Sequence, residues 1–203
     1  MKIKTYQAGP LQANNYLLTD NDEAVLIDCS ELTEELSEDL KNFNLRYVLL
    51  THGHFDHVLG INDVRKEFNT DVLIHENDLP RLEENMAIIK TFGGINIEPA
   101  KIDGYVKDNE ILEFGNTEIK VMHTAGHTEG SVSYLIDGKL FSGDTLFRDY
   151  VGRCDLPSGN FNSMKESIRK LFSLDENTEV YAGHGEMTTI GYEKLHNEIV
   201  KSL

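Results

Sequence analysis

Four side chains that can bind metal ions lie within one short segment of this sequence. They are His52, His54, Asp56 and His57. An apolar run typical of a buried strand, residues 46–50, comes directly before them, and a helical pattern follows. Side chains alternate in an extended segment, so His52 and His54 can point at the same ion. Where the chain turns into the helix, Asp56 and His57 would point at a second ion. Imidazole and carboxylate ligands together favour zinc, iron or manganese over calcium or magnesium.

Three further candidates each follow a predicted strand and stand beside a glycine. They are His127, Asp144 and His184. A glycine neighbour lets the backbone approach an ion closely. His123 lies four residues before His127, but it continues the alternation of its strand, so we assign His127 to the metal and His123 to packing or to support of a ligand. Asp144 alone would be an ordinary turn residue, and its place after two histidine motifs favours a ligand.

The seven candidates divide into two sets that share one carboxylate. We expect one ion between His52, His54, His127 and Asp144, and the other between Asp56, His57, His184 and Asp144. Each ion keeps room for a shared water, as a catalytic site needs and a closed structural site does not. A polar surface loop with incidental histidines is the alternative. Three histidines and an aspartate directly after a buried strand are more typical of a dinuclear metal site.

The surrounding pattern predicts an α/β fold with these residues at strand ends. Strands are predicted at 3–8, 15–19, 24–28, 46–50, 72–75, 110–114, 117–123, 132–136, 139–142 and 179–182, and helices at 32–40, 58–68, 76–92, 161–172 and 192–200. Open α/β sheets place their sites at the carboxyl ends of strands. Asp28 ends the third strand, where it either accepts a hydrogen bond from a ligand imidazole or caps the strand. His75 and His196 receive no role in the site.

Composition and charge exclude several classes of partner. The chain has 203 residues, 39% of them hydrophobic and 27% charged, which predicts a single globular domain over residues 1–203. The net charge of −16 disfavours nucleic acid and anionic membranes as partners. No apolar run has the length of a membrane span or the pattern of a signal peptide. Cys29 and Cys154 form no disulfide framework, which favours a reducing cytoplasm. The oligomeric state stays open.

The ordered motifs resemble those of the metallo-β-lactamase-fold hydrolases. They are His-x-His-x-Asp-His at 52–57, Gly-His-Thr at 126–128, Ser-Gly-Asp-Thr at 142–145 and Ala-Gly-His-Gly at 182–185. The resemblance extends over residues 14–192 and is strongest to the short glyoxalase II-like, or hydroxyacylglutathione hydrolase-like, enzymes. It implies a four-layer αβ/βα sandwich with a dinuclear site at one edge, between two β-sheets.

One loop adds to this resemblance and departs from it at a single position. Residues 152–160 are similar to a Gly-Arg-Thr-Asp signature of those enzymes, with Cys154 in place of the threonine. Arg153 and Asp155 are therefore candidates for supporting the ligands or contacting substrate. Ser30 also stands where a glycine often follows the first aspartate motif. Neither change affects a predicted ligand. Because no base adjoins Cys154 in the sequence, we assign it no nucleophilic role.

The ligands and the resemblance together predict a metal-dependent thioesterase. Zinc lowers the pKa of its bound water from about 15.7 to about 7, so a hydroxide bridging the two ions is the expected nucleophile. It would attack the carbonyl of a small acyl thioester of the hydroxyacylglutathione type while one metal stabilises the oxyanion. Asp56 is expected to hold this nucleophile and to carry a proton toward the leaving group. Zinc is the first expectation for both ions, with iron or manganese as alternatives.

Other functions of the same fold are weighed against this one. Related persulfide dioxygenases use only the residues matching His52, His127 and Asp144, on one iron, and the sequence contains this triad too. The intact set of seven favours the hydrolase and disfavours a non-catalytic metal-binding scaffold. Flavodiiron relatives place glutamate where His54 stands. A nuclease conflicts with the acidic charge.

The expected substrate range is broad. Nineteen residues follow His184, too few for the basic helical domain that grips glutathione in long glyoxalase II enzymes. Fewer remote contacts leave less binding energy for distinguishing one thiol from another. We therefore expect a permissive site, unless Arg153 and its neighbours in residues 147–160 form an anion pocket of their own.

Overall fold

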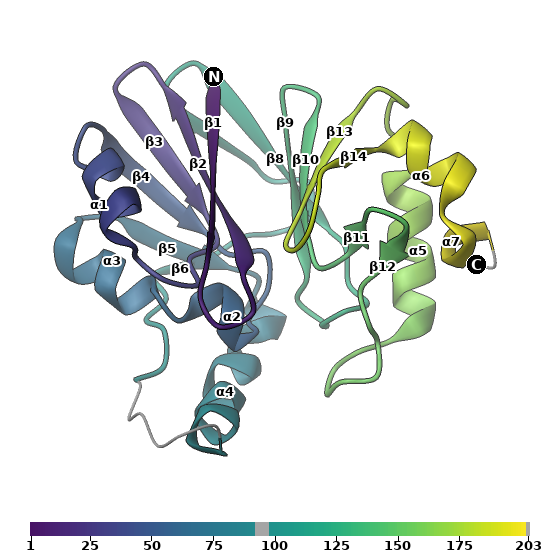
Figure 1. The fold of residues 1–203 in the computed structure, drawn as a ribbon, viewed down its shortest axis with the longest axis horizontal. Helices are drawn as coiled ribbons and strands as arrows, with labels where there is room; N and C mark the ends of the chain where they lie inside the picture. Colours follow the sequence, from purple (N-terminus) through teal and green to yellow (C-terminus); the bar gives the residue numbers. More distant parts are fainter. Residues whose placement is uncertain (92–97, 202–203) are drawn as a thin grey trace.

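Two six-stranded sheets face each other in the computed structural model, which describes residues 1–91 and 98–201. Helices cover the outer face of each sheet, so the layers run helix, sheet, sheet, helix (Figure 1). The predicted four-layer αβ/βα sandwich is confirmed. The apolar side chains between the sheets come from both halves of the chain, with Leu18, Val25 and Ile27 facing Val121, Tyr134 and Phe141.

The first sheet is built from the amino-terminal half of the chain. Its strands, in spatial order, are β1 (Lys2–Ala8), β2 (Ala13–Asp20), β3 (Glu23–Ile27), β4 (Asn44–Leu49), β5 (Asp71–Ile74) and β6 (Gly104–Tyr105). β1 to β3 are antiparallel, and β3 to β6 are parallel. Because side chains alternate, Val25 and Ile27 face the second sheet while Leu26 packs under the helices. A strand buried on both faces accounts for the continuous run Ala24–Ile27.

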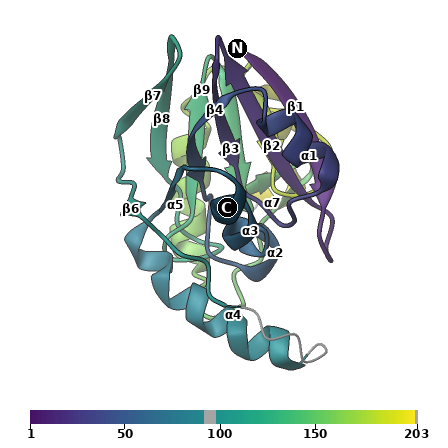
Figure 2. The ribbon, with the colours of Figure 1, turned by 90° about the vertical axis from the view of Figure 1, so that its left-hand side faces the viewer.

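The helices of the first half cover its outer face and continue toward one edge. They are α1 (Glu34–Leu40), α2 (Phe55–Val58), α3 (Ile61–Glu67), the 3₁₀ turn η1 (Glu76–Asp78) and α4 (Leu79–Thr91). The Thr33 side chain caps α1 by accepting from the Leu36 N–H at 3.2 Å. Leu36 and Leu40 are buried under this helix, as the predicted four-residue spacing requires. Figure 2 shows α4 projecting beyond the sheets at the edge where α2 lies.

The second sheet comes from the carboxyl-terminal half. Its strands are β14 (Thr188–Thr189), β13 (Glu179–Ala182), β10 (Lys139–Gly143), β9 (Val132–Ile136), β8 (Thr117–His123) and β7 (Ile111–Phe114), in that spatial order. β10 and β13 are parallel, and the other neighbours are antiparallel. A small hairpin, β11 (Leu146–Phe147) with β12 (Tyr150–Val151), follows β10. Helices α5 (Phe161–Leu171), α6 (Ile190–His196) and α7 (Glu198–Lys201) lie on the outer side (Figure 1).

The predicted strands and helices are found in the described residues, with differences in detail. The single helix predicted over 58–68 is interrupted at Leu59 and Gly60, which separate α2 from α3. The two-residue strands β6, β11, β12 and β14 were not predicted, because two residues show no alternation. The closing helix is not continuous, since Asn197 has extended backbone angles and separates α6 from α7. The predicted end of the helix near Phe92 and Gly93 lies outside the described residues. Within the described part of the chain, no helix has the length and apolarity needed to cross a membrane.

Candidate metal centre

All seven candidate ligands converge at one edge of the sandwich. His52, His54, Asp56 and His57 stand between β4 and α2 or on α2, while His127, Asp144 and His184 follow β8, β10 and β13. Three overlapping triplets have ligand atoms within 4.8 Å of one another: His52–His54–His127, His52–His57–Asp144 and Asp56–His57–His184. Each half of the chain therefore supplies part of one compact cluster.

The first group is centred on the contact between two loops. The Nδ1 atom of His54 lies 2.8 Å from the Nε2 atom of His127. The ring of His52 is 4.8 Å from that of His54 and 4.9 Å from that of His127, centroid to centroid. Asp144 completes the group through Oδ2, which is 3.5 Å from His127 Nε2. These four side chains are the predicted ligands of one ion.

The second group adjoins the first and shares Asp144 with it. His57 Nε2 lies 3.3 Å from His184 Nε2 and 3.5 Å from Asp144 Oδ1. Asp56 Oδ2 is 3.1 Å from His184 Nε2. The Asp144 carboxylate thus lies between the two groups, with Oδ1 near His57 and Oδ2 near both His127 and His184, the latter at 3.8 Å. This is the arrangement expected of a carboxylate shared between two ions.

Hydrogen bonds on the far side of the rings orient three of these histidines. The Nδ1 atom of His57 is 2.8 Å from Asp28 Oδ2, and that of His127 is 2.8 Å from the Arg153 carbonyl oxygen. The Nδ1 atom of His52 is 3.1 Å from the hydroxyl of Thr51. When Nδ1 donates in each case, the Nε2 lone pair points into the cluster, as a metal ligand requires. Of the two roles considered for Asp28, support of an imidazole matches this geometry.

Two buried atoms in the cluster have no hydrogen-bond partner among the described residues. They are His52 Nε2 and Asp144 Oδ1. A buried polar atom without a partner costs about 1–3 kcal/mol, and metal ions bound in this cluster would satisfy both atoms. Gly183 keeps the space open, because a Cβ atom there would lie 2.2 Å from Asp144 Oδ1 and 2.8 Å from His57 Cε1. The donor set and the crowding fit divalent transition-metal ions.

Burial and neighbouring charges shift the pKa values in the cluster in opposite directions. Burial, with nearby His127, lowers the pKa of His54 to about 4. Burial also opposes the charged form of His57, but the carboxylates of Asp144, Asp28 and Asp56 outweigh it and raise its pKa to about 10. Burial would raise the pKa of Asp56, yet the histidines beside it lower that pKa to about 2. The carboxylate is therefore ionised at neutral pH.

The other histidines of interest lie outside the cluster. His123 Nε2 is 2.9 Å from the Glu129 carbonyl oxygen, and its ring stacks on His75 with centroids 4.3 Å apart. His75 also accepts from the Asn77 N–H at the start of η1. His196 is on α6 and packs against Tyr192. These three residues have structural contacts in the described chain.

The loop of Arg153 contacts the cluster through its backbone. The Arg153 guanidinium forms a two-fold hydrogen bond with Asp155, at 2.7 and 2.8 Å, and both side chains are exposed. This pairing lowers the pKa of Asp155 to about 2. Cys154 is half-buried, and burial raises the pKa of its thiol. The described contacts of this loop with a ligand run through the Arg153 carbonyl.

Several supporting residues escaped prediction because their contacts span long stretches of sequence. Asn14 donates through Nδ2 to the carbonyls of Ala182 and Gly185, at 3.0 Å each, and so grips the His184 loop. Asp78 accepts from the loops of His54 and His127. The available signals were weak: Asn14 reads as a turn residue and Asp78 as the cap of a helix.

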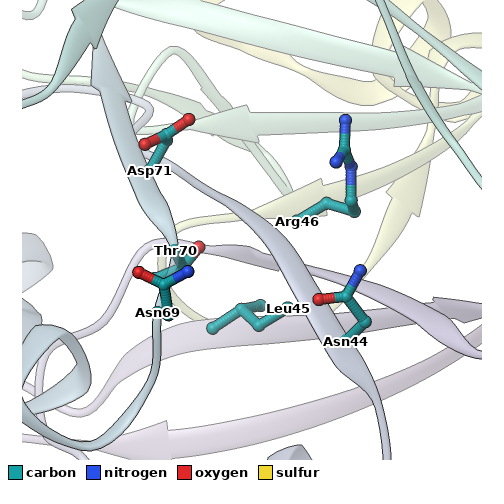
Figure 3. A pocket seen from close by; sticks show the side chains of 6 residues that line it. All are labelled: Asn44, Leu45, Arg46, Asn69, Thr70 and Asp71. Carbon is teal, nitrogen blue, oxygen red and sulfur yellow. The ribbon is translucent and has the colours of Figure 1, made fainter.

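One described cavity lies away from this cluster. It measures about 180 Å³ and is lined by Asn44, Leu45, Arg46, Asn69, Thr70 and Asp71 (Figure 3). Asn44 and Asp71 begin β4 and β5, whereas the cluster follows the other end of β4. The cavity is therefore at the opposite end of these strands and is separate from the candidate metal centre.

Comparison with known proteins supplies relatives over nearly the whole chain. The chain is 32% identical over 210 residues to hydroxyacylglutathione hydrolase GloC of Haemophilus influenzae, covering 100% of this chain and 99% of GloC. The crystal structure of BLEG-1, a B3 metallo-beta-lactamase, matches with a TM-score of 0.89 and 37% identity over 98% of this chain and 99% of that one. TTHA1623 in a di-iron-bound form matches with a TM-score of 0.86 and 32% identity over 97% and 99%.

The family follows from the sequence pattern of the domain itself. The family model of the metallo-beta-lactamase superfamily matches residues 8–184, which include all seven candidate ligands. The fold, the convergent histidines and carboxylates, and the matched relatives agree with it. This chain belongs to the metallo-β-lactamase superfamily and is a metal-dependent hydrolase of that superfamily.

Proposed function

We propose that this protein hydrolyses small acyl thioesters of the hydroxyacylglutathione type with two divalent transition-metal ions. One ion would be held by His52, His54, His127 and Asp144, and the other by Asp56, His57, His184 and Asp144. The observation that carries the proposal is the convergence of all seven side chains on one edge, with the Asp144 carboxylate between the two groups. The similarity to GloC supports a thioester substrate, and that to di-iron TTHA1623 supports two ions.

The chain's own residues prepare the site for this reaction. Bound ions of this class make water nucleophilic at neutral pH and polarise a carbonyl oxygen. Asp28, Thr51 and the Arg153 carbonyl fix three imidazole rings before any ion binds, which lowers the cost of organising the ligands. Asp56 is ionised and lies beside His184, so its carboxylate can accept a hydrogen bond from the attacking water and orient it.

The leaving group explains why a thioester suits this cluster. A thiol has a pKa near 8.5, so the thiolate departs without an elaborate general acid. We assign to Asp56 the proton of the attacking water, which it would deliver to the departing sulfur. No nucleophilic thiol is required, and the raised pKa of Cys154 keeps that side chain protonated at neutral pH.

Selectivity for the thiol is proposed to be weak. The Arg153 guanidinium is already paired with Asp155, so it is not a free anchor for the carboxylates of glutathione. The net charge of −16 provides no general attraction for an anionic carrier. The same acyl group on glutathione, coenzyme A and a minimal thiol should therefore give similar kcat/KM values. A preference for glutathione above about a hundredfold, or about 2.7 kcal/mol, contradicts this.

We propose that the protein is located in the reducing cytoplasm. Cys29 and Cys154 are both free thiols, and Cys29 is fully buried in the first half of the sandwich. A disulfide framework is the usual sign of an oxidising compartment. Free thiols in both halves of the fold support a compartment that keeps them reduced.

The decisive test pairs metal content with three substrates. Elemental analysis after gentle purification should approach two transition-metal ions per chain, and the loaded enzyme should turn over an acyl thioester faster than a glutathione persulfide or a β-lactam. One iron per chain with consumption of oxygen on the persulfide would establish the mononuclear dioxygenase instead. Faster hydrolysis of the β-lactam than of the thioester would establish a β-lactamase activity, as the name of BLEG-1 indicates for that protein. Metal binding without turnover of any substrate would favour a scaffold.

A further inference from the structure

We infer that Asp78 is a positioning residue that holds the loops of His54 and His127 at the separation the first ion needs. The inference rests on the proposed two-ion site and extends it to a residue outside the seven ligands. Asp78 ends η1, is 0% exposed, and lies directly before α4. The two loops it contacts belong to different halves of the chain.

The carboxylate of Asp78 accepts three hydrogen bonds from these loops. Its Oδ2 atom accepts from the Gly53 N–H at 2.7 Å and from the Thr128 hydroxyl at 2.8 Å. Its Oδ1 atom accepts from the Gly130 N–H at 2.8 Å. Gly53 stands between His52 and His54, and Thr128 follows His127. One side chain therefore joins the residue between His52 and His54 to the residue that follows His127.

Neighbouring residues reinforce the same contact. Both backbone polar groups of Gly53 are hydrogen-bonded, because its N–H donates to Asp78 and its carbonyl accepts from Asn85 Nδ2 at 2.7 Å. Gly130 approaches so closely that a Cβ atom there would lie 2.6 Å from the Asp78 Oδ1 atom. The contact admits no other side chain at Gly130 without displacement of η1. The result of this bracing is the 2.8 Å approach of His54 Nδ1 to His127 Nε2.

Only a carboxylate can satisfy this arrangement. All three partners point a hydrogen at Asp78, and an ionised carboxylate has acceptors alone. Asparagine has the same shape but replaces one oxygen with an NH₂ group. In one orientation that group opposes the Gly130 N–H, and in the other it opposes the Gly53 N–H. Asp78→Asn therefore loses the hydrogen bond from the Gly130 N–H in the first orientation and the hydrogen bond from the Gly53 N–H in the second, so the contact between the loops is weakened in either case.

The second group has its own supports. Asp28 holds His57, and Asn14 grips the loop of His184. None of the hydrogen bonds described for the Asp78 side chain reaches α2 or the His184 loop. Loss of the Asp78 contacts should therefore weaken the first ion and spare the second, whereas a general packing defect would weaken both.

Two backgrounds, each with one ion site weakened, separate these outcomes. His184→Ala removes a ligand of the second group, and His54→Ala removes a ligand of the first. We would measure the Zn²⁺ dissociation constant by chelator competition in each background, with and without Asp78→Asn. The expected result is at least tenfold weaker binding in the His184→Ala background and a change below about twofold in the His54→Ala background. Equal weakening in both, or no change in either, overturns the inference.

Two controls complete the design. Asp63→Asn is the matched change at an exposed aspartate of α3, and it should leave both dissociation constants unaltered. Thr128→Val removes one donor to Asp78 and should weaken only the first ion, by about fivefold. If Asp78→Asn does not fold, judged by thermal unfolding of the metal-free protein, Thr128→Val decides the question by the same selectivity. If wild-type protein binds fewer than two ions, the proposed site itself fails.

Discussion

Asp28→Asn should weaken binding of the second ion without disturbing the fold. Asp28 accepts from the Thr51 N–H and hydroxyl at 2.7 Å each and from His57 Nδ1 at 2.8 Å. Its backbone is left-handed, with φ at 57°. Asparagine tolerates that conformation as well as aspartate does, so the substitution changes the hydrogen bonding and the charge but adds no backbone strain. Alanine at this position would add backbone strain and confuse the result.

The magnitude follows from the bond to His57. An amide in place of the carboxylate either turns its NH₂ toward His57 or loses the charge that strengthens this bond. A hydrogen bond to a charged group contributes about 1.5–3 kcal/mol. At about 1.36 kcal/mol for each factor of ten, the dissociation constant of the second ion should rise roughly tenfold to 150-fold. Among the described hydrogen bonds, the first group is linked to Asp28 only through Thr51, whose hydroxyl contacts both Asp28 and His52.

Chelator competition with Zn²⁺ in the His54→Ala background, where binding of the first ion is weakened, measures the affinity of the second ion. Activity of the two-ion enzyme should fall in parallel when Zn²⁺ is limiting and recover in part when it is in excess. Asp63→Asn again provides the matched exposed change. A dissociation constant within about twofold of the parent would show that Asp28 does not orient His57. Activity lost with metal binding intact would point instead to a direct contact with substrate.

Three further predictions concern individual side chains. His127→Ala should lose metal and nearly all turnover, while His123→Ala should retain both, since His123 contacts His75 and Glu129 outside the cluster; the reverse pattern would assign the ligand to His123. Cys154→Ser should remain active, and loss of activity with full metal content would give the thiol a role. Metal binding at pH 7 should release the proton of His57, whose pKa is about 10 in the metal-free protein, so affinity should fall as the pH is lowered. Calorimetry in buffers of different ionisation enthalpy measures this release, and its absence would refute it.

The raised pKa of His57 also makes the stability of the metal-free protein depend on pH. Its pKa is raised above the ordinary 6.5, so in the metal-free protein it stabilises the fold fully below pH 6.5. That contribution is lost as the pH rises toward 10. The effect of His54 has the opposite sign, because its pKa of about 4 means that stability falls as the pH drops from 6.5 toward 4. As far as these two histidines determine it, the free energy of unfolding of the metal-free protein should therefore be highest near pH 6.5 and fall on both sides.

The parts of the fold that could be predicted are those with a local pattern. A short apolar run after turn residues identified Ala24–Ile27 as a strand, and the spacing of Leu36 and Leu40 identified α1. Four candidate ligands were adjacent in sequence, and the other three stood beside glycines at strand ends. The two-residue strands carry no such pattern. β6 and β14 pair at the edges of the two large sheets, and β11 and β12 pair with each other in a hairpin.

The supporting residues could not be predicted, because their roles exist only in the folded chain. Asp78 is 25 residues from Gly53 and 52 from Gly130, and Asn14 is 168 from Ala182. In the sequence each is a polar residue beside a turn or a helix start. A contact over such separations leaves no periodic signal. Arg153 was singled out in the sequence for its side chain, which suggested an anion site. In the folded chain it is the Arg153 carbonyl that contacts His127.

The division of the ligands between the two halves of the chain gives metal binding a mechanical consequence. His52 and His57 follow a strand of the first sheet, and His127, Asp144 and His184 follow strands of the second. An ion bound by both acts as a cross-link across the seam where the sheets meet. By mass action, an ion present at a thousand times its dissociation constant adds about 4 kcal/mol to the free energy of unfolding. Chelation should therefore open this seam first, and proteases should then cleave the loops along it while the interior of each sheet is still protected.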